Sequence, residues 1–283
     1  MSFIGFFLSN AQFLDNTFAD NGIYFENSFS PGGPVSTFKY ETGAITDDSK
    51  ILVAGTFTYS SIGKSGGFVR RLNLDGSIDN TFNLYVRKPV NIEEKSFGFR
   101  SIFIQPDQKI LLGDTFCYNL TRLNKNGDKD LSFGFNGEIS ESVINNNFNN
   151  FGLKPVELRK IYSSSDGKIL VLCSATNIAD NSKKSIIFQL NEDGSINNSF
   201  GNNGALIQDG INGSFLLNNN KLIFVTHNIQ NSSSVFTRFE LNGQIDASFN
   251  TKIINYNLDN GYKIEFIDAH SDGNYIYMGG NGH

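Results

Sequence analysis

The acidic residues that recur at one position of a repeated string are the first candidates for chemistry. Asp15, Asp79, Asp130 and Asp246 each stand three residues before a phenylalanine, and Asn197 occupies the same place in a further copy. Carboxylates can act as general acids or bases, or as calcium ligands. Five-fold repetition favours a structural turn instead, and "DGSID" lacks the further oxygen ligands and distal Glu of a calcium loop. We therefore predict no catalytic or metal-binding residue among them.

The other residue types able to do chemistry are scattered along the chain. His227, His270 and His283 show no spacing that suits metal ligands or a catalytic triad. The glycine-rich "GKSGG" (63–67) lacks the upstream glycine of a phosphate-binding loop, and no helical pattern follows it. We therefore expect a protein that is not an enzyme and that holds no metal and no cofactor.

The composition narrows the structural class and the possible partners. Hydrophobic residues make up 39 % and charged residues 18 %, with 28 Gly, 27 Phe and 5 Pro, which is typical of an all-β protein with many tight turns. The net charge of −5, without a basic cluster, disfavours nucleic acid as a partner. No apolar run is long enough for membrane insertion, and the apolar start lacks the basic leader of a signal peptide. Cys117 and Cys173 are each expected to be a small buried side chain without a disulfide framework.

Two landmarks alternate along the chain and define an internal repeat. The first is a polar turn followed by an apolar run, and its copies align on Lys50, Lys109, Lys168, Lys221 and Asn274. The second is a D-x-x-F string that ends at Phe18, Phe82, Phe133, Phe200 and Phe249. In the third unit, four short β-branched or aromatic segments are bounded by turn residues: 156–162, 168–172, 185–191 and 204–208. The sequence therefore predicts four antiparallel strands in each unit.

Units of this kind predict an all-β, five-bladed β-propeller of four-stranded antiparallel blades, as a single domain of residues 1–283. The predicted blades span approximately 23–82, 83–133, 134–200, 201–249, and 250–283 together with 1–22. The fifth unit lacks its second half at the C-terminus, and residues 2–22 align with 68–82. We therefore expect strands from both termini to close the last blade, with residues 2–8 paired to 274–280, which removes open sheet edges.

Three strings carry a resemblance to a known family: "DGKILV" (166–171), "DGSIDNTF" (75–82) and "NEDGSINNSFGNNG" (191–204). They resemble the delta-60 repeat, a bacterial β-propeller repeat, and the resemblance extends over nearly the whole chain. It implies a propeller. Members of this family often form parts of larger bacterial surface proteins, and similar repeats are expected among phage structural proteins. The family has no single chemistry, so the resemblance implies no site residues.

The repeated charged and aromatic residues are predicted to be structural. An arginine stands eight residues before the repeated aspartate in three units, and both partners change together in the third unit. The expected pairs across the hairpin are Arg71–Asp79, Arg122–Asp130 and Arg238–Asp246, with Gln189–Asn197 as the neutral equivalent. The remaining unit has Phe7 in place of the arginine, with Asp15 retained. The five phenylalanines of the D-x-x-F strings are expected to wedge between adjacent blades.

One face of the propeller is expected to carry the irregular loops. In an up-and-down blade, the second-to-third and fourth-to-first strand connections share the face opposite the tight turns. The irregular segments fall there: 56–67, 83–96, 140–155, 174–184 and 227–234. Loops on a rigid scaffold often carry binding residues, so we predict partner contacts at Tyr59, Tyr85, Phe148 and Asn228. The alternative is drift in unconstrained loops.

The sequence thus favours a non-enzymatic binding or structural module that presents a loop face to a protein or surface glycan. The expected setting is a phage virion, as a tail component, or a bacterial cell surface. One alternative is a carbohydrate-binding lectin, which the absence of Trp disfavours. Another is a glycoside hydrolase, which needs two carboxylates about 5–10 Å apart. No two non-repeated acidic residues are identified that must converge in this way.

Overall fold

The computed structural model describes most of the chain after its first 16 residues. The described residues are 17–20, 23–24, 31, 33–89, 96–114, 119–139, 141–164, 166–218, 221–228, 233–255, 264–271 and 275–282. They form two compact units, which are taken separately below. The first unit comprises Met1–Thr115 with Thr121–Asp130, and the second comprises Phe116–Leu120 with Leu131–His283.

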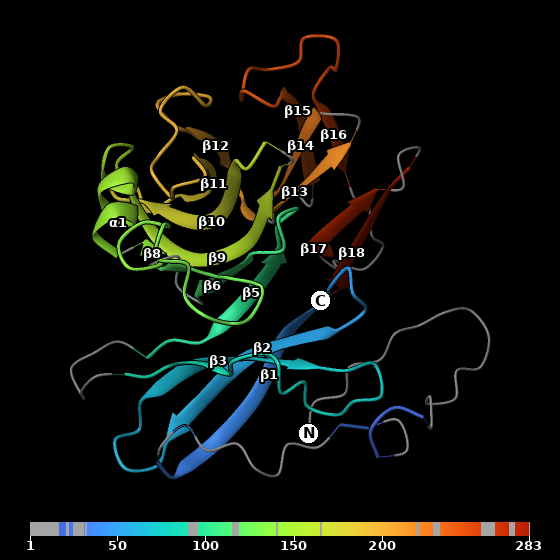
Figure 1. Cartoon of the computed structure of the whole chain (residues 1–283). Coiled ribbons are helices and arrows are strands. Elements are labelled where there is room, and N and C mark those ends of the chain that lie inside the picture. The colour runs from blue at the N-terminus through green and yellow to red at the C-terminus, as the bar shows by residue number, and fades with distance from the viewer. Residues whose placement is uncertain are drawn as a thin grey trace. The chain divides into compact units, whose positions relative to one another are not determined.

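The first unit contains a four-stranded sheet and the strands that follow it in sequence (Figure 1). The first sheet has the order β1-β2-β3-β4, with every neighbouring pair antiparallel. Its strands are β1 (Val35–Ile45), β2 (Ile51–Tyr59), β3 (Ser65–Leu72) and β4 (Tyr85–Arg87). The next sheet begins with the neighbours β5 (Phe99–Ile104), β6 (Ile110–Asp114) and β7 (Leu120–Leu123).

The second unit contains two further four-stranded antiparallel sheets (Figure 1). It begins with the short strand β8 (Glu138–Ile139) and helix α1 (Glu141–Asn149). The third sheet, in the order β12-β11-β10-β9, consists of β9 (Leu153–Ser163), β10 (Ile169–Asn177), β11 (Lys183–Leu190) and β12 (Ala205–Asp209). The fourth sheet consists of β13 (Ile211–Asn218), β14 (Lys221–Asn228), β15 (Ser233–Glu240) and β16 (Lys252–Asn255). A two-stranded sheet follows, made of β17 (Ile264–Ser271) and β18 (Ile276–Gly282).

The prediction of an all-β chain with four-stranded antiparallel sheets is confirmed. In the third repeat, the predicted segments overlap β9 to β12, and the sheet runs in simple sequence order. The inner strand β10 is buried along residues 169–173, because its Ile, Leu, Val and Cys side chains pack on both faces of the sheet. The pairing of residues 2–8 with 274–280 lies outside the described residues.

The sequence analysis did not predict helix α1. The helix lies within segment 140–155, which was expected to be an irregular loop. Its sequence "ESVINNNFN" is rich in asparagine, a poor helix former, so local propensity gives no helical signal. The helix presents Ile144 and Phe148, four residues apart, as fully buried side chains. The Phe148 ring centroid lies 6.1 Å from that of Phe188 in β11. Packing on the third sheet therefore stabilises a helix that propensity does not favour.

The segments after four of the five D-x-x-F strings, those ending at Phe18, Phe82, Phe133 and Phe200, dock on the turn of the following repeat. The backbone N–H of the residue after the phenylalanine donates to a backbone carbonyl in that turn. The four such bonds are Ala19 to Asp75 (2.6 Å), Asn83 to Asn126 (2.7 Å), Gly134 to Asp193 (2.8 Å) and Gly201 to Asn242 (2.9 Å). Each accepting residue precedes a glycine with positive φ: Gly76, Gly127, Gly194 and Gly243. The repeated string therefore builds both halves of a junction between successive repeats.

The turn glycine is required at this junction for two separate reasons. Gly243 has a φ of 82°, which is strained for residues with a side chain. A Cβ on Gly243 would also lie 2.5 Å from the backbone nitrogen of Gly201. By contrast, Gly152 has a φ of 63° but nothing within 4 Å of its Cβ position.

We predict that Gly243→Ala lowers the free energy of unfolding by more than Gly152→Ala does. The second substitution introduces only backbone strain of about 1 kcal/mol, whereas the first also pushes the docked segment away. Chemical denaturation of the two variants and the parent measures the difference. Equal losses would show that the docked segment does not constrain the turn.

Candidate functional site

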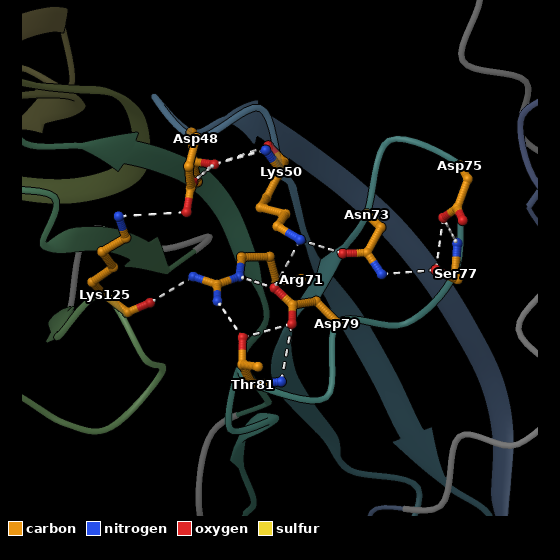
Figure 2. A network of polar contacts seen from close by, with 10 residues as sticks. Asp48, Lys50, Arg71, Asn73, Asp75, Ser77, Asp79, Thr81 and Lys125 are labelled. Atoms are coloured by element: carbon orange, nitrogen blue, oxygen red, sulfur yellow. Dashed lines mark hydrogen bonds and ion pairs between the residues drawn. The ribbon is translucent and has the colours of Figure 1, made fainter.

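In three repeats, the recurring arginine and aspartate meet in a polar network next to the tight turn. In the first repeat, Arg71 is the next-to-last residue of β3 and its Nε lies 2.8 Å from Asp79 Oδ2 (Figure 2). The other carboxylate oxygen of Asp79 accepts hydrogen bonds from the backbone N–H and the hydroxyl of Thr81, at 2.9 and 2.6 Å. Arg71 Nη2 donates to the same hydroxyl at 3.0 Å. Both oxygens of Asp79 are therefore used within the turn.

A lysine that the sequence analysis did not connect to this pair also belongs to the network. Lys50 Nζ lies 3.8 Å from Asp79 Oδ2 and donates to Asn73 Oδ1 (Figure 2). The lysine heads the apolar run of the first landmark, and β2 and β3 pair so that Leu52 lies opposite Arg71. Its recurrence at Lys50, Lys109, Lys168 and Lys221 was the signal that could have identified it.

The network also connects the first repeat to the next. Arg71 Nη1 donates to the backbone carbonyl of Lys125 at 2.9 Å. Lys125 Nζ in turn lies 3.4 Å from Asp48 Oδ2, a carboxylate in the turn between β1 and β2 (Figure 2). The side chains of this network thus contribute to the junction described above.

Other repeats carry copies of the same network. Arg122 Nε lies 2.7 Å from Asp130 Oδ2, and Arg238 Nε lies 2.8 Å from Asp246 Oδ2. Lysines approach the same carboxylates, Lys109 at 3.3 Å and Lys221 at 3.6 Å. In the third repeat, Asn197 Nδ2 donates to Gln189 Oε1 at 2.6 Å. The structure therefore brings each of the four pairs derived from the sequence within hydrogen-bonding distance.

The carboxylates of Asp79 and Asp246 are held in the ionised state. Hydrogen bonds from Thr81 and from Arg71 lower the pKa of Asp79 from 3.8 to about 2. Hydrogen bonds from Ser248 and from Arg238 lower the pKa of Asp246 to about 2 in the same way. A group with such a low pKa does not donate a proton at neutral pH and is a weak general base. The arrangement therefore suits a structural turn.

Two phenylalanines of the D-x-x-F strings, Phe82 and Phe200, lie where successive sheets meet. Phe82 packs in a cluster with side chains of the first sheet and of β5 to β7, and Phe200 packs with those of the third and fourth sheets. Phe133 is fully buried, whereas Phe18 and Phe249 are half-buried. The Arg71 guanidinium lies 5.0 Å from the ring centroid of Phe82, so the polar network covers the edge of the apolar cluster.

Two of the four predicted partner-binding residues lie inside the fold, which corrects the expectation that they are exposed on loops. Phe148 is a fully buried residue of α1. Tyr59 ends β2 and is 9 % exposed, with its hydroxyl donating to the Pro31 carbonyl at 2.9 Å. Tyr85 is half-buried beside Phe99, and Asn228 ends β14. The sequence marked these aromatic residues as loop residues because the strands and α1 extend further than the repeat pattern indicates.

The irregular segment 174–184 carries an exposed apolar residue that the sequence analysis did not select. Ile178 is 61 % exposed in the turn between β10 and β11. Its backbone N–H donates to the Gly152 carbonyl, which fixes the turn next to the end of α1. An exposed apolar side chain on a fixed turn is suited to contact a partner.

Cys173 is fully buried in β10, as expected, but it forms a disulfide, which the sequence analysis did not expect. The chain holds one other cysteine, Cys117, which lies outside the described residues. The repeat pattern gave no signal for a disulfide, because Cys173 has no cysteine at the equivalent position of another repeat. In the part of the chain that the structure describes, no group of three or more His, Cys, Asp or Glu could hold a metal ion. The described helix is too short and too polar to cross a membrane.

A pocket lies beside the polar pair of the third repeat. The pocket has a volume of about 280 Å³, and it is lined by residues of the β9–β10 turn, the β11 end and the turn after β15. It includes Lys168, Gln189 and Asn197, which are the third repeat's members of the polar network. The replacement of the charged pair by an amide pair thus coincides with an open space.

We predict energetic coupling between Arg122 and Asp130, because both side chains are buried and share a hydrogen bond. A double-mutant cycle with alanine substitutions should give a coupling of about 0.5–3 kcal/mol in the free energy of unfolding. The matched control is the same cycle at Gln189 and Asn197, where the coupling should be independent of added salt. Additive single substitutions at Arg122 and Asp130 would contradict the pairing.

We also predict that the fold loses stability at acid pH through Asp79 and Asp246. Both carboxylates have a folded-state pKa of about 2, below the ordinary value of 3.8. Their stabilising contribution is therefore fully present above about pH 4 and is lost as the pH falls towards 2. Asp79→Asn should lower the melting temperature at pH 7 and flatten its dependence on pH between 4 and 2. A parent-like pH dependence in this variant would contradict the assignment.

The comparisons with known proteins agree with a repeated β architecture. Residues 46–82 and 164–200 match the family model described as "Domain of unknown function (DUF5122) beta-propeller". Each match begins at a first-landmark turn and ends at a phenylalanine of a D-x-x-F string, so it includes one polar network. The comparison with curated proteins gave no match.

Several solved structures resemble the chain at low similarity. The "Streptogramin B lyase structure" shares 9 % identity at a TM-score of 0.37, covering 84 % of this chain and 82 % of that one. The extracellular domain of the putative one component system BT4673 from B. thetaiotaomicron shares 13 % identity at a TM-score of 0.34, covering 89 % and 33 %. The major Malassezia sympodialis allergen Mala s 1 shares 11 % at 0.33, covering 80 % and 83 %. The family match and the four-stranded antiparallel sheets together support a β-propeller repeat, but they do not identify it as the delta-60 repeat.

Proposed function

We propose that the chain is a five-bladed, ring-closed β-propeller that acts as a non-enzymatic binding module and presents its loop face to a protein or glycan. The single observation that supports this best is that the recurring polar side chains bind one another within the turns. In the described repeats, the arginines and aspartates at the turns are hydrogen-bonded to one another, and the aspartates with a resolved pKa are ionised. The residues that recur therefore build a scaffold, which leaves the irregular segments to contact a partner.

Closure of the ring is supported by the segment just after Phe18. The Ala19 N–H docks on the Asp75 carbonyl in the turn of the first sheet, as the equivalent residues do at later junctions. A segment that docks in this way behaves as the end of a repeat that precedes the first sheet. At the other end of the chain, β17 and β18 supply two strands of a repeat. We propose that residues 2–8 complete that repeat beside β18.

The proposed setting is a phage virion or a bacterial cell surface. The disulfide of Cys173 favours this setting, because disulfides persist in oxidising environments and on virion and cell surfaces. The polar surface, rich in Asn and Ser, is compatible with either setting.

A second candidate function is carbohydrate binding. The observation that favours it is the pocket beside Gln189 and Asn197, which combines amide, hydroxyl, charged and apolar side chains. Sugar-binding sites need this mixture of directional hydrogen bonds and apolar surface. A glycoside hydrolase is less favoured, because the repeated carboxylates that are candidates for acid–base chemistry are engaged in the turns.

We predict that removal of residues 1–18 lowers stability well beyond the ~1 kcal/mol typical of a point substitution, because the last blade loses its closing strand and the side chain of Phe18. Thermal unfolding of the truncated and parent chains measures the effect. The control is Ala19→Gly, which keeps the docking N–H and should unfold close to the parent. A truncated chain with the melting temperature of the parent would contradict ring closure.

We predict that Ile178→Asp weakens partner binding without changing the melting temperature. The matched control is Ile245→Asp, because Ile245 is similarly exposed, at 68 %, but lies on a tight turn. Partners can be identified by pull-down from bacterial surface extracts and by a glycan array, and affinities can then be measured for both variants. Loss of binding in Ile245→Asp alone would place the function on the turn face instead.

A further inference from the structure

The pocket of the third repeat lies where the other repeats place a guanidinium group. In the first repeat, the Arg71 guanidinium forms an ion pair with Asp79 and also donates to the Lys125 carbonyl of the next turn. The corresponding residues beside the pocket are Gln189 and Leu241. Glutamine is shorter than arginine and its amide is held by Asn197, so the space beyond it stays open. The cavity of about 280 Å³ is the result.

Two charged groups at this pocket lack the ionic partners that their equivalents have. Lys168 Nζ donates to Asn191 Oδ1 at 2.6 Å, but among the described residues it forms no ion pair, because Asn197 replaces the aspartate. Asp166 is equivalent to Asp48, whose partner is Lys125, and the residue at that position here is Leu241. In the described part of the chain, the Asp166 carboxylate has only local hydrogen bonds, to the Ser164 hydroxyl and the Lys168 backbone N–H.

The pocket therefore holds one ammonium and one carboxylate, which balance each other, together with uncharged polar groups. Gln189, Asn197 and Ser199 supply amide and hydroxyl groups, and Phe200 and Leu241 supply apolar surface. A balanced charge favours neither anions nor cations. A carboxylate beside amide and ammonium donors matches adjacent hydroxyl groups, which both donate and accept. The volume of about 280 Å³ lies just below the ~300–1,000 Å³ of small-molecule sites, which suits a ligand of one ring.

We propose that this pocket binds one neutral sugar residue of a glycan. The Asp166 carboxylate accepts from ring hydroxyls, Lys168 Nζ and the Gln189 amide donate to them, and Leu241 covers an apolar face of the ring. This proposal rests on the proposed function as a binding module, and it assigns the binding of glycans to this pocket. The three changes that open the pocket occur together at one junction, while the networks of Arg71, Arg122 and Arg238 keep their ion pairs.

The test uses a variant that fills the pocket without weakening the fold. Gln189→Arg with Asn197→Asp recreates the polar pair of the first repeat, so the guanidinium occupies the cavity. We expect a melting temperature equal to or above that of the parent. Sugar binding should weaken by about tenfold or more, measured by saturation-transfer NMR and calorimetry with glucose, galactose, mannose and N-acetylglucosamine. The control is Leu74→Arg, which adds an arginine at a turn residue that is 59 % exposed and should bind sugar like the parent.

The outcomes separate this proposal from the broader function. Sugar binding by the parent and by Leu74→Arg, but not by the pocket-filling variant, supports the proposal. Equal binding by the pocket-filling variant, or no millimolar binding of any tested sugar by the parent, overturns it. Binding of only acetate or only guanidinium at this site overturns the sugar assignment as well. If a macromolecular partner binds the pocket-filling variant and the parent equally, the binding module stands and the pocket has no part in it.

Discussion

The structure depends on one backbone hydrogen bond, which recurs at four junctions between successive repeats. The N–H after the D-x-x-F string donates to a carbonyl next to a turn glycine, at Asp75, Asn126, Asp193 and Asn242. The bond needs a turn with positive φ, which explains the glycine. It also needs a fixed carbonyl direction, which the buried polar network beside the turn supplies. The residues that recur in the repeat therefore form the two sides of one junction.

The polar network supports this junction at a modest energetic cost. Burying an ion pair removes two charges from water, and the loss is offset only when hydrogen bonds satisfy the remaining polar atoms. Asp79 meets this condition, because both of its oxygens accept hydrogen bonds from Thr81 or Arg71. The neutral pair of Gln189 and Asn197 shows that the turn also forms without charge. The charged form is thus one of two solutions to the same geometric problem, and the neutral form leaves space for a ligand.

The sequence predicted the scaffold well because the scaffold is repeated. Alternating landmarks predicted four strands per unit, and co-variation of Gln189 with Asn197 predicted a cross-hairpin pair. Features that occur once had no such support. Helix α1 forms because Ile144 and Phe148 pack into a core, which an asparagine-rich segment does not reveal. The disulfide of Cys173 and the burial of Tyr59 likewise depend on three-dimensional packing, which the repeat pattern does not indicate. The pocket follows from Leu241 and Gln189 acting together, two positions that belong to different repeats.

Native-state hydrogen exchange tests the hydrogen bond at the junction most directly, because it reports on individual backbone amides in the parent chain. The account predicts that the amides of Asn83, Gly134 and Gly201 exchange slowly, with protection comparable to that of the inner strand β10. All three lie outside regular strands, so slow exchange requires the hydrogen bonds to the next turn. Exchange at these amides as fast as in exposed loops would show that the repeats are not joined in this way.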